Sequence, residues 1–262
     1  MLTLFTSTDK ESKMKRTGIV LMLMGTLLMA QSAQEVAKRS FEKVSGYQSS
    51  ISETTMILKN AQGATNTRKM RILKLEGSHG DKSLIVFLYP MDIKDTKLLS
   101  YEQIGKDDKQ WLYLPALKRV KRISSRNKSG SFMASEFSYE DIASQNYQNY
   151  RYQGEAKKVT IHGKSYLKIV RIPKDKHSGY SKQVVYIDPK TYLAQFGEYY
   201  DKNGRLLKKA TFLKYRKIDG IDRIVKMKMS NVQNGKSTLL IWNKDTIHAH
   251  LSDSDFSKRI LQ

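Results

Sequence analysis

The clearest structural signal in this chain is a β-hairpin. Residues 192–215 read YLAQFGEYYDKNGRLLKKATFLKY, with Asn203-Gly204 near the middle of the run. Asn-Gly supplies at low cost the two positive-φ residues that a tight two-residue turn needs. We therefore expect two antiparallel strands, Tyr192–Tyr200 and Leu206–Tyr215, joined at this turn.

Similar strand signals continue along most of the chain. Asn234-Gly235 precedes Ser237–Trp242 and predicts a second tight hairpin. Further short apolar runs bounded by turn residues predict strands at Thr54–Lys59, Arg68–Glu76, Leu84–Tyr89, Lys97–Ile104, Gln110–Leu114, Tyr166–Ile172, Gln183–Ile187 and Arg223–Ser230.

One helix is expected before these strands. Ala37, Phe41 and Val44 have helical spacing within residues 34–45. No alternation of strands with long helices, no internal repeat and no linker follows, which argues against a parallel sheet and against a second domain. Residues 34–262 are therefore expected to form one mainly β (α+β) domain with an antiparallel sheet.

Several predicted strands are apolar on both faces. In Leu84–Tyr89 and in Trp111–Leu114, large apolar side chains occupy successive positions, which point to opposite sides of a sheet. One face must therefore meet a core or a cavity. The other needs a helix, a second sheet or a partner.

Residues 1–33 resemble an export signal. The basic run Met14-Lys15-Arg16 precedes an apolar stretch, residues 19–30, that is shorter than the roughly 20 residues of a membrane-spanning helix. Small residues favour cleavage after Ser32. We expect a cleaved signal peptide and a soluble mature chain; an uncleaved anchor or a buried helix is the alternative. Residues 1–13 are expected to be an over-extension of the gene start.

Composition excludes several classes of function. The chain has no cysteine, which excludes disulfides, cysteine zinc sites, thiol nucleophiles and a lipid-modified N-terminal cysteine. With 47 Lys and Arg against 25 Asp and Glu, the net charge is +22. Because the protein is expected to leave the cytoplasm, we expect this charge to serve anionic envelope surfaces and not nucleic acid.

The search for catalytic motifs finds little. Gly-x-Ser-x-Gly, a phosphate-binding glycine loop and His-Glu-x-x-His are all missing from the sequence. His248 and His250 would share one face of a strand, with Asp253 or Asp255 as further metal ligands, but solvated surface histidines are the favoured interpretation. No catalytic residue, metal ligand or cofactor is expected.

A basic run lies between residues 117 and 128. Lys118, Arg119, Lys121 and Arg122 fall in it, and no acidic residue does. A solvated rim is the simpler explanation. The functional alternative is contact with anionic lipid headgroups, where each such charge contributes roughly 1 kcal/mol.

The segment after this run, residues 129–142, combines glycine with bulky apolar residues. It begins as a flexible loop, then carries Phe132, Met133, Phe137 and Tyr139, and Ser138 with Asp141 can cap a short helix. A lid over an apolar pocket needs these properties, and so does a loop that plugs its own core. The residues alone do not decide between the two.

These stretches also carry a resemblance. WLYLPALKRVKRI at residues 111–123 and SGSFMASEFSYED at residues 129–141 resemble the signature of the outer-membrane lipoprotein-sorting family of LolA-like proteins. YPMDIKDT at residues 89–96 resembles another segment of that family. Asp95 and Ala134 stand where glycine is usual, and Glu136 where aspartate is usual.

The resemblance implies a strongly curved antiparallel sheet that forms a half-open barrel, with a few helices as a lid over an apolar cavity. It implies a periplasmic, non-catalytic carrier that takes acyl chains of lipoproteins or lipids from an inner-membrane exporter, of the RND type, to an outer-membrane acceptor. The expected cavity and lid residues are Phe87, Tyr89, Trp111, Tyr113, Phe132, Met133, Phe137 and Tyr139. Lys118, Arg119, Lys121 and Arg122 are the expected membrane or partner contacts. The alternatives are an exported hydrolase or metal-dependent enzyme acting on anionic envelope polymers, and a non-catalytic polysaccharide-binding protein.

Overall fold

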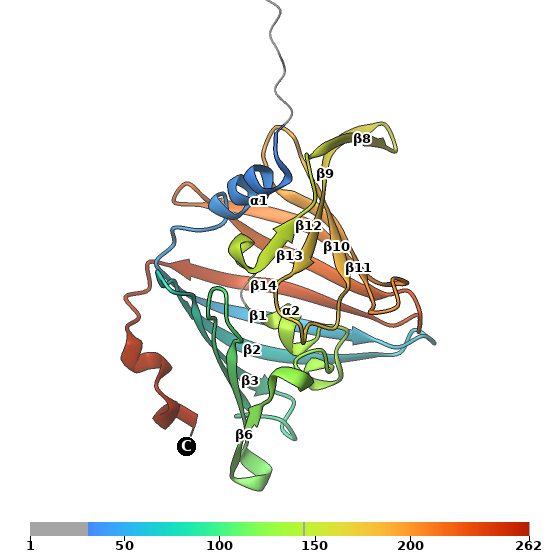
Figure 1. Ribbon diagram of the computed structural model, residues 1–262. Helices are drawn as coiled ribbons and strands as arrows, with labels where there is room; N and C mark the ends of the chain where they lie inside the picture. The colour runs from blue at the N-terminus through green and yellow to red at the C-terminus, as the bar shows by residue number, and fades with distance from the viewer. Residues whose placement is uncertain (1–30, 144, 262) are drawn as a thin grey trace, which may run out of the picture.

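The computed structural model describes residues 31–143 and 145–261, and a single antiparallel sheet dominates it (Figure 1). The strands are β1 (Ser49–Lys59), β2 (Thr65–Leu75), β3 (Lys82–Tyr89), β4 (Lys97–Tyr101), β5 (Lys109–Leu114), β6 (Arg119–Ile123), β7 (Tyr150–Tyr152), β8 (Lys157–Ile161), β9 (Lys164–Pro173), β10 (Lys182–Ile187), β11 (Ala194–Tyr200), β12 (Leu206–Ile218), β13 (Ile221–Asn231) and β14 (Ser237–Ile247). The helices are α1 (Ala33–Glu42) and α2 (Tyr139–Ile142). Short 3₁₀ turns are η1 (Pro115–Leu117), η2 (Ser125–Asn127), η3 (Phe132–Ala134), η4 (Tyr147–Asn149), η5 (Asp253–Phe256) and η6 (Lys258–Leu261).

The sheet is open and curved. Its strands follow the order β6-β5-β4-β3-β2-β1-β14-β13-β12-β11-β10-β9-β7, and β8 pairs with β9 outside this path. The end strands β6 and β7 are not neighbours, so the sheet curves around a central space without closing (Figure 1). This confirms the predicted mainly β fold with a half-open barrel.

Both predicted hairpins are confirmed. β11 and β12 pair on either side of Asn203-Gly204, and β13 and β14 pair on either side of Asn234-Gly235. The predicted strand Lys97–Ile104 is too long, because β4 ends at Tyr101. The short strands β6, β7 and β8 are structural findings that the sequence patterns did not predict.

The two faces of β2–β5 have different covers. The concave face carries the main core, which includes Met70, Ile85 and Phe87 and continues into the segment after β6. The outer face carries Leu84, Leu99, Trp111 and their neighbours, which pack against Phe256 and Leu261. This arrangement confirms that both faces of these strands need a cover.

The cover of the outer face is the end of the chain itself. Residues 251–261 run along this side of the sheet (Figure 1). Lys82 Nζ lies 2.7 Å from Asp253 Oδ1, and Lys97 Nζ donates to the carbonyl of Ile260 at 2.5 Å. The tail therefore takes the place that a second sheet or a partner would otherwise fill.

Helix α1 closes one end of the curved sheet. Ser32 caps it, its Oγ accepting from the Glu35 amide at 3.1 Å, and Val36 and Ala37 bury their side chains against Ile169 and Ile187. The helix predicted for residues 34–45 is thus confirmed with slightly different ends.

The signal-peptide prediction falls mostly on residues 1–30, outside the described residues. Among those described, no helix has the length and apolar character to cross a membrane.

Candidate functional site

The concave face of the sheet is not completely filled. A cavity of about 330 Å³ lies between this face and the elements that cover it. Its apolar wall is formed by strand residues: Met70, Ile72, Ile85, Ile169, Val185, Ile187, Phe212, Ile224, Met227, Met229, Leu240 and Trp242. This volume lies within the roughly 300–1,000 Å³ of small-molecule pockets, and the wall suits an apolar ligand.

Two parts of the chain cover the cavity. α1 contributes Ala37 and Phe41, and the segment around α2 contributes Ile142 and Tyr147. The rings of Phe41 and Tyr147 meet with their centroids 5.6 Å apart, which joins the two covers. These elements occupy the place that was expected for a helical lid.

The first part of the segment after β6 is a plug. Phe132 has no exposed surface, and its ring lies 5.7 Å from the ring of Phe87 and 5.7 Å from that of Tyr139. Met133 packs on the same core, and its carbonyl accepts a hydrogen bond from Arg68. In this region the segment fills the core, as expected for a loop that plugs its own core and not for a lid.

Phe137 has a different position. Its side chain is also buried, at 2% exposure, but it lines the cavity, whereas Phe132 does not.

The two residues that stand where the family usually has glycine share a backbone feature: Asp95 has φ 63° and Ala134 has φ 57°. The chain keeps there a conformation that glycine adopts most easily.

The expected wall residues Trp111 and Tyr113 lie elsewhere. Both point to the outer face of β5, where they pack in the cluster of Phe256 and Leu261, so their placement in the cavity wall was wrong. Leu112, between them, faces the concave core instead. The expectation failed because both faces of this strand are apolar, so the sequence does not reveal which residues face inward.

Three other expected ligand contacts also lie away from the cavity. Phe87 is fully buried beneath Phe132. Tyr89 is 50% exposed at the end of β3. Tyr139 packs on the main core beside Phe132. None of them lines the 330 Å³ cavity, whose wall includes only Phe137 of the eight expected residues.

The basic run forms an exposed border of the sheet. β6 is an end strand, and Lys118, Arg119, Lys121 and Arg122 are all exposed on it or on the turn before it. Leu117 and Val120, on the same border, are 62% and 42% exposed. The position suits either of the two interpretations of the run, and the membrane or partner contact stays a prediction.

The cavity also has charged lining residues that the sequence patterns did not predict. Lys74, Arg171 and Arg223 line it, and so do five carboxylates: Glu76, Asp81, Asp141, Asp222 and Asp245. Arg223 donates to Asp245 at 2.7 and 3.2 Å. Arg171 donates to Gln183 Oε1 at 2.8 Å and lies 4.0 Å from the ring centre of Tyr150. The available signal was the position of Lys74 on the same strand face as Met70 and Ile72.

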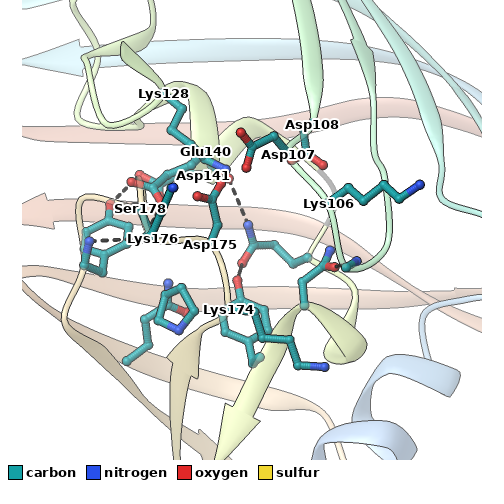
Figure 2. A pocket seen from close by; sticks show the side chains of 17 residues that line it. Lys106, Asp107, Asp108, Lys128, Glu140, Asp141, Lys174, Asp175, Lys176 and Ser178 are labelled. Atoms are coloured by element: carbon teal, nitrogen blue, oxygen red, sulfur yellow. Dashed lines mark hydrogen bonds and ion pairs between the residues drawn. The ribbon is translucent and has the colours of Figure 1, made fainter. Parts of the chain in front are cut away.

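A second, polar pocket of about 280 Å³ is lined in part by Glu140 and Asp141 of α2 (Figure 2). Lys128 pairs with Asp175, and Glu140 accepts from Ser178 Oγ at 2.6 Å and from the Gly179 amide at 2.8 Å. Burial raises the pKa of the Glu140 carboxyl, although these hydrogen bonds act in the opposite direction.

A buried triad adds a further anchor for α2. Asp141 accepts from Tyr180 Oη at 2.9 Å and pairs with Lys208 Nζ at 3.1 Å, and Lys208 also donates to Tyr180 at 3.0 Å. Ser138 and Asp141 form the predicted capping box of the helix. These contacts hold α2 against β12 and fix the cover of the cavity.

The metal hypothesis has no support in the geometry. β14 ends at Ile247, and His248 and His250 follow with φ of 52° and 55°, so the two histidines do not share a strand face. Within residues 31–143 and 145–261, no group of three or more His, Cys, Asp or Glu is arranged to hold a metal ion.

The structure predicts different effects for two phenylalanines. Phe132→Ala and Phe137→Ala should each lower the free energy of unfolding by about 3–5 kcal/mol, because both side chains are buried. Only Phe137→Ala should also change the affinity for a neutral apolar dye such as N-phenyl-1-naphthylamine, because only Phe137 lines the cavity.

Urea unfolding and dye titration measure the two effects, with the exposed Ser129→Ala as the control. If Phe132→Ala leaves the urea midpoint unchanged and weakens dye binding, Phe132 is a mobile lid residue and not part of the core.

Comparison with known proteins identifies the family. A family model described only as an uncharacterized protein matches residues 79–262. No curated protein sequence matches the chain. A structure described as an outer membrane lipoprotein-sorting protein domain from Vibrio parahaemolyticus is 44% identical, with a TM-score of 0.83, over 87% of this chain and 97% of its own.

Two further solved structures are similar. A DUF1329 family protein from Desulfovibrio piger is 33% identical with a TM-score of 0.82, over 88% of this chain and 98% of its own. A LolA superfamily protein from Nitrosomonas europaea shares the fold, with a TM-score of 0.73 at 18% identity, over 88% of this chain and 99% of its own. The chain has the LolA-like fold and belongs to the family of the outer membrane lipoprotein-sorting protein domain.

Proposed function

We propose that this protein is a periplasmic carrier that binds acyl chains of a lipoprotein or lipid in the 330 Å³ cavity and delivers them toward the outer membrane. Membership of a lipoprotein-sorting family and the LolA-like fold support a carrier-type role. The proposed role is binding and release, without a chemical step.

The observation that carries the proposal is the covered apolar cavity. Its wall of Met, Ile, Leu and aromatic side chains lies beneath α1 and the segment around α2. Burying hydrocarbon contributes about 0.8 kcal/mol per CH₂, so ten buried methylenes would contribute about 8 kcal/mol before the costs of binding. A carrier needs a cavity of this character because it must keep the chain away from water.

The same energetics require partners. An acyl chain gains a similar free energy from the bilayer that it leaves, so extraction needs a donor that opens the cover and offsets this cost. We propose an inner-membrane exporter of the RND type as donor and an outer-membrane component as acceptor. The contact between Phe41 and Tyr147 is the place where we expect the two covers to separate.

Tryptophan fluorescence offers a direct binding test. The chain has two tryptophans: Trp242 lines the cavity and Trp111 lies on the outer face. In the variant Trp111→Phe, the emission of Trp242 should shift on addition of dodecanoate below its micellar concentration, with saturation at one site. The matched variant Trp242→Phe keeps Trp111 and should show little change. A shift from Trp111 alone would place the ligand outside the cavity.

The basic border is proposed as the membrane contact. Replacing Lys118, Arg119, Lys121 and Arg122 by Gln should slow association with vesicles that contain anionic lipid, and should flatten its salt dependence, because long-range attraction is lost. Ligand bound in the cavity should remain. Vesicle co-sedimentation and stopped-flow association at two salt concentrations measure these effects.

A control with the same loss of charge separates position from net charge. Lys157, Lys158, Lys164 and Lys190 are exposed and lie on or near β8–β10, away from the basic border. Replacing these four by Gln should have a clearly smaller effect. Equal effects of the two sets would assign the attraction to the +22 charge as a whole, and loss of bound ligand would mean that the border contributes to the cavity.

A further inference from the structure

A polar row crosses the concave face of β1–β5. It consists of one residue from each of five adjacent strands, paired in register: Ser50 of β1, Lys74 of β2, Ser83 of β3, Ser100 of β4 and Gln110 of β5. The next row on the same face is apolar over four of its five strands, with Ile72, Ile85, Leu98 and Leu112 beside Ser52. Of the polar row, Ser50, Lys74 and Ser83 line the cavity, beside the apolar Ile72 and Ile85 of the next row.

Most members of the row already have partners. Gln110 Nε2 donates to Ser100 Oγ at 3.1 Å and to the carbonyl of Tyr139 at 3.2 Å. Ser50 Oγ accepts from Arg223 at 3.3 Å. These bonds fix the two ends of the row around Lys74 and Ser83.

Lys74 is different. It lines the large cavity and also an adjoining pocket of about 10 Å³, which is about the size of one water molecule. Among the described residues, no hydrogen bond or ion pair involves its ammonium group. Arg223, whose charge acts on Lys74, pairs with Asp245, which leaves that carboxylate engaged.

The ammonium group of Lys74 lies among charges of both signs. Burial lowers the pKa of Lys74, and the charge of Arg223 lowers it further, whereas Asp81, Asp245 and Glu102 favour the protonated form. An enclosed charge without a direct partner costs free energy, and an anion that pairs with it would offset that cost. Carboxylate and phosphate oxygens also accept hydrogen bonds from hydroxyls such as that of Ser83.

We propose that the cavity takes a single-chain acyl amphiphile with an anionic head, which pairs with Lys74 while its tail lies along the apolar wall. This inference rests on the proposed carrier function and specifies the class of its ligand. The head is a carboxylate or a phosphate, since both offer the same acceptor chemistry. The cavity volume of about 330 Å³ favours one chain.

Three probes with the same tail test the proposal: dodecanoate, dodecyl phosphate and dodecan-1-ol, each titrated calorimetrically below its micellar concentration near neutral pH. The native protein should bind at least one of the anions about tenfold or more tightly than the alcohol. The better anion identifies the head. Inorganic phosphate alone should not displace either anion at comparable concentration, because the tail supplies much of the affinity.

The decisive variant is Lys74→Met, which keeps the length and apolar stem of the side chain and removes the charge. It should lose the preference for the anion, with the affinity for the alcohol unchanged or slightly higher. Lys69→Met is the matched control, because Lys69 is exposed on the opposite face of the same strand. Lys74→Arg keeps the charge and should retain much of the preference, and urea midpoints verify that each variant is folded.

The possible outcomes distinguish a failure of the proposed Lys74 site from a failure of the proposed carrier function. An anion preference that survives in Lys74→Met, or a native protein that binds the alcohol as tightly as the anions, overturns the role of Lys74 and leaves the carrier proposal in place. Inorganic phosphate binding as tightly as dodecyl phosphate overturns the amphiphile assignment. A folded native protein that binds none of the three tails contradicts the carrier proposal itself.

Discussion

A sheet with apolar side chains on both faces must be covered on both sides. If either apolar face were exposed to water, it would drive association or unfolding. This constraint accounts for the segments outside the sheet. On the outer face, residues 251–261 lie over Leu84, Leu99 and Trp111. On the concave face, the segment after β6 buries Phe132 and Phe137, and α1 packs on the strands at the other end.

The cavity exists because the concave cover is incomplete. The plug around Phe132 packs against Phe87 of β3, and α1 packs against Ile169 and Ile187 of β9 and β10. The cavity wall includes Met227 and Trp242, which are only partly buried. The polar anchors of α2 keep this arrangement in place. Asp141, Tyr180 and Lys208 tie the helix to the sheet, so the cover is held by specific contacts and not only by apolar packing. A carrier could open at α1 while the plug remains in the core.

Local chemistry made much of the fold predictable. Asn203-Gly204 and Asn234-Gly235 marked their hairpins because few other dipeptides adopt that turn so readily. Ser138 and Asp141 marked the start of α2 through a capping box. The short strand β6 was missed because its residues are mostly basic and exposed, so it lacks the apolar signal of a strand. Residues 251–261 were missed because serine, aspartate and lysine surround the few apolar anchors.

The site was harder to predict, and for one physical reason. A strand with apolar residues at every position does not show which parity faces inward, so Trp111 and Tyr113 were assigned to the wrong side. Lys74 had the opposite problem: it is one of 47 Lys and Arg residues, and although it shares a strand face with Met70 and Ile72, the sequence does not show that this face lines a cavity. Position in the folded sheet, and not residue type, distinguishes it from the exposed lysines.

Native mass spectrometry of the protein purified from cells without detergent can show whether the cavity holds an acyl chain. The proposed binding of an acyl chain predicts one bound molecule per chain, identified as acyl-containing after denaturation. It also predicts loss of this mass in Ile224→Trp, because Ile224 lines the cavity and a larger side chain would fill it. A native protein without any acyl compound, or a variant that retains the same bound mass, would contradict this proposal.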